Sequence, residues 1–106
     1  MVEGTVTYDL LPNVELQAYA LWAKKATEAT LKAPGLIEFR AHRGFMARAQ
    51  VRTTTVWQSM ADWAKFIEGP WQQMEAEMRV YATNLRSELW GPSPLPMFRE
   101  PLRPGK

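Results

Sequence analysis

Three side chains of this 106-residue chain could act directly on a small molecule, and we predict Tyr8, Arg40 and His42 as its catalytic residues. His42 is the only histidine, and an imidazole is the side chain best suited to remove a proton from a ligand near neutral pH. Arg40 could pair with the resulting anion, and Tyr8 could donate a hydrogen bond to it. Each has a purely structural alternative: an exposed or interface histidine, an ion pair between Arg40 and Glu38 across a dimer, and a tyrosine that only packs.

The chain is also rich in tryptophan, with five such residues. A buried indole covers a large area and needs a partner for its N–H group, so five of them indicate a large core, a dimer interface or an aromatic pocket. We predict that a pocket for a flat ligand is lined by Phe39, Trp57, Trp63, Phe66, Trp71, Met74, Met78 and Tyr81. The alternative is an ordinary core, because apolar side chains at helical spacing usually pack there.

Composition excludes several other chemistries. The chain has no cysteine and one histidine, so disulfides, thiolate catalysis and Cys-ligated zinc are excluded and we expect no metal site. A net charge of +2 does not indicate nucleic-acid binding. No apolar run is long enough to span a membrane and no signal-peptide pattern is present, so we expect a cytoplasmic protein with no membrane partner. Phosphate-binding glycine loops and hydrolase motifs are also missing from the sequence.

The first half of the chain predicts a strand, a helix and a second strand that would position these residues. Residues 3–11 alternate between apolar and polar, and the alternation places Tyr8 on the apolar side. Asn13 is a suitable N-cap for a helix over 14–32. The apolar stripe of that helix is expected to contain Leu16, Tyr19, Ala20, Ala23, Thr27, Thr30 and Leu31. After Pro34-Gly35, residues 36–46 alternate again.

The second half predicts a strand, an interrupted helix and a last strand. A hairpin connection at Met46 to Arg48 leads into a β-branched strand over 50–58. Ser59-Met-Ala-Asp62 has the form of a capping box, and the helix that it opens is interrupted or restarted at Pro70 and expected to end near Asn84. Residues 85–90 would form the fourth strand.

The resulting order, βαββαβ, predicts an α+β fold of the ferredoxin-like type over residues 1–90, with a four-stranded antiparallel sheet and both helices on one face. The other face would carry the mixed polar side chains Thr5, Thr7, Asp9, Glu38, Arg40 and His42. Because this face needs a cover, we predict a homodimer. Residues 91–106 contain five of the eight prolines and form a tail, which is either disordered or an ordered arm across the partner subunit.

The element order, the segment TTTVWQSMADWAKFI at 53–67 and the segment PGLIEFRAHRG at 34–44 resemble the antibiotic-biosynthesis monooxygenase family over residues 3–90. The resemblance implies a dimeric α/β barrel of ferredoxin-like fold. It also implies a cofactor-independent monooxygenase that holds a small phenolic or quinol-like aromatic in a dry pocket. The alternatives are a non-catalytic dimeric module for ligand binding or interaction, and an isomerase of a lactone or enol.

A haem-degrading branch of this family is not favoured. The resemblance places the catalytic tryptophan of that branch at Phe66 and its iron-ligating histidine at Ala76, and neither residue matches. We therefore expect no cofactor.

Overall fold

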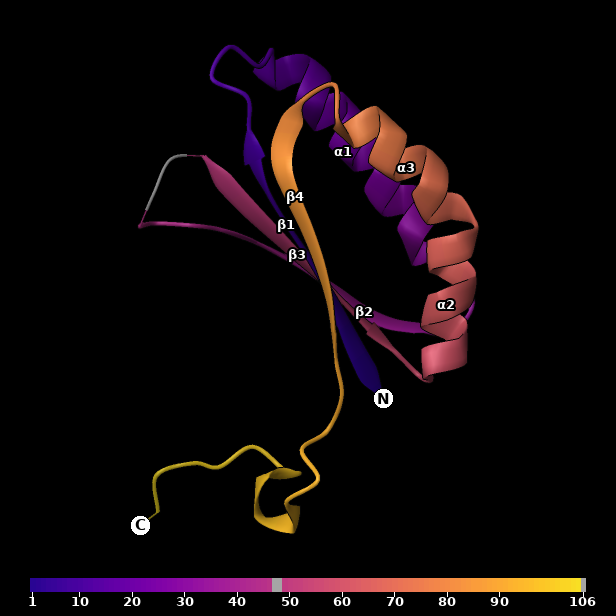
Figure 1. Cartoon of the computed structure of the whole chain (residues 1–106), viewed down its shortest axis with the longest axis vertical. Coiled ribbons are helices and arrows are strands. Elements are labelled where there is room, and N and C mark those ends of the chain that lie inside the picture. The colour runs from indigo at the N-terminus through magenta and orange to yellow at the C-terminus, as the bar shows by residue number, and fades with distance from the viewer. Residues whose placement is uncertain (47–48, 106) are drawn as a thin grey trace.

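The computed structural model describes residues 1–46 and 49–105, and in these residues three α-helices cover one face of a four-stranded antiparallel sheet (Figure 1). The elements are β1 (Val2–Leu10), α1 (Leu16–Leu31), β2 (Leu36–Arg43), β3 (Gln50–Trp57), α2 (Met60–Glu68), α3 (Pro70–Met78), β4 (Ala82–Trp90) and a short 3₁₀ helix at Pro96–Phe98. The strand order is β2-β3-β1-β4. The predicted ferredoxin-like fold of the α+β class is therefore confirmed.

Helix α1 differs from its prediction at its start and on its inner face. Asn13 is not the cap; the carboxylate of Glu15 accepts hydrogen bonds from the backbone N–H groups of Gln17 at 3.0 Å and Ala18 at 3.3 Å. A carboxylate at this end satisfies two free amides and complements the helix dipole, which explains the later start. Leu16 and Leu31, which were expected to face inward, are 63% and 59% exposed. The side chains that face the sheet are Tyr19, Trp22, Ala23, Ala26, Thr27 and Thr30.

The capping box and the interruption at Pro70 are confirmed. The hydroxyl of Ser59 accepts a hydrogen bond from the backbone N–H of Asp62 at 3.1 Å and donates one to its carboxylate at 2.9 Å. Helix α2 ends before Gly69, and α3 begins with Pro70, whose missing N–H costs nothing in a first helical turn.

The prediction that the last helix continues to Asn84 is wrong. Helix α3 ends at Met78, and β4 begins at Ala82, where it already pairs with β1. Asn84 adopts a positive φ of 56° beside a register shift in β1, and its amide donates to the Asp9 carboxylate at 2.9 Å. Asparagine tolerates this conformation better than most residues, so the strand can bulge here and still pair.

The end of β2 and the chain beyond β4 complete the description of the fold. The second strand ends at Arg43, three residues earlier than predicted, and positions 47–48 of the predicted hairpin connection lie outside the described residues. Past β4 the chain leads away from the sheet (Figure 1), with Leu95, Met97, Phe98 and Leu102 exposed. Among the helices of the described part, none is long and apolar enough to cross a membrane.

The core lies between the helices and the sheet and has two centres. One contains Tyr8, Met78 and Ala82, and the other contains Trp57, Phe66 and Met74. The opposite face of the sheet, which we call the open face, carries the odd-numbered side chains of β1 and their register partners. This alternation decides which predicted site residues can meet.

Candidate functional site

A cavity of about 140 Å³ lies between the helix layer and the sheet. Its lining includes small and apolar side chains from the strands, aromatic rings from α1, α2 and α3, and several hydroxyl groups. Six of the eight residues predicted to bind a ligand line it: Phe39, Trp63, Phe66, Trp71, Met74 and Met78. None of the described residues that line this cavity carries a charge, so it suits a neutral or weakly polar ligand.

Gly4 of β1 makes room for one of these rings. A Cβ atom at Gly4 would lie 3.0 Å from Nε1 of Trp63 and 3.2 Å from the hydroxyl of Thr55. Trp63 therefore lies close to the backbone of β1, and a larger residue at position 4 would require Trp63 or Thr55 to shift by a few tenths of an ångström.

The hydroxyl groups of Tyr8 and Tyr19 form the polar feature of the cavity, 2.7 Å apart. Only 3% of Tyr8 is exposed, and this burial, together with the hydrogen bond to Tyr19, raises the pKa of its phenol far above the ordinary value. Tyr8 therefore remains protonated and can donate a hydrogen bond, but it cannot serve as a base at neutral pH. Because one hydroxyl donates to the other, the accepting hydroxyl keeps its own hydrogen for a ligand.

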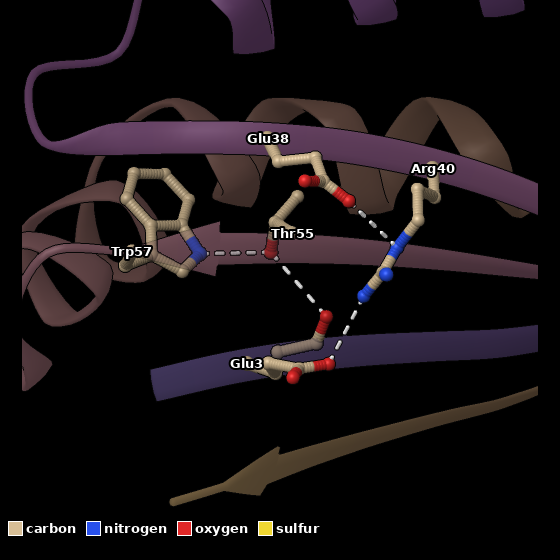
Figure 2. A network of polar contacts seen from close by, with 6 residues as sticks. Glu3, Glu38, Arg40, Thr55 and Trp57 are labelled. Atoms are coloured by element: carbon tan, nitrogen blue, oxygen red, sulfur yellow. Dashed lines mark hydrogen bonds and ion pairs between the residues drawn. The ribbon is translucent and has the colours of Figure 1, made fainter. Parts of the chain in front are cut away.

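The two remaining residues of the predicted pocket lie outside the cavity. Trp57 is fully buried beneath α2, where its ring packs on Phe66 at 5.1 Å between centroids. Its indole N–H donates to the hydroxyl of Thr55 at 2.8 Å, and that hydroxyl donates to the carbonyl of Gly4 at 3.3 Å (Figure 2). Tyr81 packs against Trp22 on the outer side of the helix layer. Both aromatic rings therefore serve packing around the cavity.

Arg40 and His42 lie on the open face, away from the cavity. Arg40 is paired with register partner Thr54, and its guanidinium bridges Glu3 and Glu38, each at 3.1 Å (Figure 2). His42 is opposite Arg52 in the same sheet. The structure does not bring either residue together with Tyr8, because residues two apart on a strand share a face and Phe39 and Ala41 take the cavity side. Their catalytic roles stay predictions.

Sequence analysis missed Trp22 as a site residue. It lines the cavity from α1, together with Tyr19, Ala23 and Ala26. Trp22 lies three residues after Tyr19, a spacing typical of one helix face, but the predicted apolar stripe begins at Leu16, which is exposed. A stripe that starts at Tyr19 would have included the tryptophan.

Comparison with known proteins supports the fold. The sequence matches no protein-family model and no curated protein. The structure is similar to that of SnoaB, a cofactor-independent oxygenase from Streptomyces nogalater, with a TM-score of 0.72 and 9% identity over 90% of this chain and 95% of that one.

Two further solved structures agree. A protein of Deinococcus radiodurans, provisionally assigned as an antibiotic biosynthesis monooxygenase, has a TM-score of 0.75 and 14% identity over 100% of both chains. MupZ from Pseudomonas fluorescens has a TM-score of 0.71 and 16% identity over 86% of this chain and 71% of that one. The chain therefore shares the ferredoxin-like fold of these structures, and its resemblance to the antibiotic-biosynthesis monooxygenase family is confirmed at the level of the fold.

Proposed function

We propose that the protein is a cofactor-independent monooxygenase of a small phenolic or quinol-like aromatic, which it holds in the cavity between sheet and helices. The observation that carries this proposal is the uncharged aromatic lining with the paired hydroxyl groups of Tyr8 and Tyr19 among its hydroxyls. A volume of about 140 Å³ is close to the roughly 150 Å³ of an apolar cavity that holds benzene. The ligand class that fits is therefore a single ring with one or two oxygen substituents.

The reaction can be balanced without a bound cofactor. The ionised ring donates electrons to dioxygen; one oxygen atom becomes a new carbonyl oxygen on a ring carbon that bore two hydrogens in the keto form. The other oxygen atom leaves as water with those two hydrogens. The free hydroxyl hydrogen of the tyrosine pair stabilises negative charge on the substrate oxygen, and the apolar walls exclude water.

The absence of a base among the described lining residues defines the substrate further. Tyr8 stays protonated, and Arg40 and His42 lie on the other face. The phenol must therefore lose its proton to water as it enters, which selects a readily ionised phenol or an activated quinol.

The absence of a base among the described lining residues also favours a second candidate function, a non-catalytic module that binds a phenolic ring without turnover. An isomerase of a lactone or enol is the third. Dioxygen uptake by the purified protein with a panel of hydroquinones and activated phenols separates them: a monooxygenase consumes one dioxygen per substrate with no added cofactor. Binding without uptake supports the module, and conversion under argon supports the isomerase.

We further propose that the open face is covered by a second copy of the chain. Strand register aligns two rows of side chains on this face. The first row lies near the end of β2 and the start of β3 and contains His42, Arg52, Thr7 and Arg86. The second row contains Glu38, Val56, Glu3 and Trp90. A row with Arg40 and Glu88 lies between them, and Arg40 bridges the two glutamates. The positive charge therefore falls from the first row to the second, and we call them the basic row and the acidic row.

This polarity makes the face complementary to itself. A two-fold axis that runs across the strands reverses the strand direction, so it places the basic row of one copy over the acidic row of its partner. A two-fold axis along the strands would place like charges together. The charge pattern therefore favours a face-to-face homodimer with its strands antiparallel across the interface.

A further inference from the structure

A second hollow lies on the outer side of the helix layer, between α1 and α3. It has a volume of about 830 Å³ and is lined mainly by apolar side chains. Three residues line both this outer groove and the inner cavity: Trp22, Ala26 and Met74. At this place one layer of side chains separates the cavity from the surface.

Trp22 is the largest part of that layer and is held by a specific contact. Its indole N–H donates to one carboxylate oxygen of Glu77 on α3 at 2.8 Å, and the other oxygen accepts a hydrogen bond from Gln73 at 2.8 Å. Beside the indole, Ala26 is small and Met74 is flexible, so neither obstructs movement of the ring. This hydrogen bond, together with ring contacts to Tyr19 and Tyr81 at 6.2 and 5.9 Å between centroids, holds the indole across the gap between the two helices.

We propose that the outer groove is the entrance to the cavity and that Trp22, fastened by Glu77, determines which ligands pass. The inference rests on the proposed function, because it assumes that the cavity takes a ligand. Rotation of the indole away from Glu77 opens a slot between α1 and α3 whose remaining walls are Ala26 and Met74. Such a slot admits a flat aromatic ring edge-on and excludes bulky molecules.

The structure offers one competing route, at the edge strand β2. Ala41 lines the cavity and is also exposed, so a ligand could enter beside it. The two routes can be tested separately. Ala41 lies on β2 and lines the cavity, whereas Glu77 lies on α3 and lines only the outer groove.

The test is stopped-flow fluorescence under argon with hydroquinone as the probe, read as quenching of the tryptophans of the folded protein. Glu77→Ala should raise the association and dissociation rates together, by up to about tenfold for the loss of a hydrogen bond to a charged acceptor, with Kd unchanged. Trp22→Phe keeps a ring but lacks the N–H donor, and it should likewise raise the association and dissociation rates. Glu77→Gln retains an acceptor oxygen and should stay near the wild-type rates.

The matched control is Glu75→Ala, which removes another carboxylate of α3 that pairs with Arg79 and lines neither hollow, and it should leave both rates unchanged. Ala41→Leu narrows the competing route. Slower binding by Ala41→Leu with unchanged rates for Glu77→Ala and Trp22→Phe would overturn the entrance but leave the proposed function standing. Failure of the wild-type protein to bind hydroquinone would count against the proposed function itself, and against the entrance with it.

Discussion

At the scale of single residues, the site depends on a tyrosine that is kept neutral. Desolvation raises the pKa of Tyr8, and the hydrogen bond to Tyr19 raises it further. In the proposed reaction the tyrosine pair donates a hydrogen bond to the substrate oxygen, and Tyr8 never acts as a base.

Replacement of Tyr8 by phenylalanine tests this role. Tyr8→Phe should lower kcat by about 100-fold, the usual loss when one donor to a developing oxyanion is removed, and should change KM little. Dioxygen uptake measures both constants. Tyr81→Phe is the control, because its ring lies outside the cavity, and an equal loss of activity in that variant would remove Tyr8 from the site.

Glu77 should leave a signature in the pH dependence of stability. Hydrogen bonds from Gln73 and Trp22, with Lys25 nearby, lower the pKa of this carboxyl below its ordinary value of 4.5. A carboxyl whose pKa is lowered in the folded state stabilises the fold above pH 4.5 and loses this contribution as the pH falls through the lowered value.

Urea unfolding of wild type and Glu77→Gln between pH 7 and pH 3 measures the contribution of the Glu77 carboxylate to stability. The wild type should be the more stable protein at pH 7, and the difference should shrink in the acid range. A difference that does not change with pH would mean that the carboxylate charge contributes nothing to the contact with Trp22.

At the scale of elements, the sheet and the helices could be predicted from the sequence because alternation, a capping box and proline positions are local signals. The end of the last helix could not, because the pairing of β4 with β1 and the hydrogen bond from Asn84 to Asp9 are long-range contacts. The same difference between local signals and long-range contacts decides which site residues could be predicted. The helix spacing identified most of the lining, but only the packed structure shows that Trp57 is buried outside the cavity and that Trp22 lines it.

The contact between β1 and α2 provides a prediction at this scale. Gly4→Ala should destabilise the protein by about 1–3 kcal/mol, the usual cost of inserting a methyl group into a packed region, because the new Cβ would meet Trp63. Thermal unfolding measures the change. Gly91→Ala is a matched control, since a Cβ there has no atom within 4 Å, and equal effects of the two variants would contradict the close approach.

At the scale of the whole molecule, the charged rows of the open face predict how two copies associate. Arg52→Glu and Glu38→Lys should each weaken the dimer, because each places like charges opposite one another, and the double variant should regain affinity because it exchanges the two charges. Sedimentation at low and high salt measures the dissociation constant. Lys24→Glu, on the exposed side of α1, is the control and should have no effect. A double variant weaker than either single one would contradict the antiparallel arrangement.

The division of the chain into a domain and a tail is a separate prediction at this scale. Deletion of residues 92–106 should leave the thermal unfolding of the remaining chain unchanged, because all elements of the sheet end by Trp90. If the tail is an arm across a partner, the same deletion should weaken the dimer. Loss of folding on deletion would show that the tail belongs to the domain.

The central claim is that the cavity holds a small aromatic ring for direct reaction with dioxygen. Its most direct test is one incubation of the purified protein with a hydroquinone substrate under isotopically labelled dioxygen, followed by mass spectrometry of the product. We expect one labelled oxygen atom per product molecule without any added cofactor, and labelling about 100-fold slower in Tyr8→Phe. A ligand recovered unchanged, or a product that carries no label, would show that the cavity does not support this reaction.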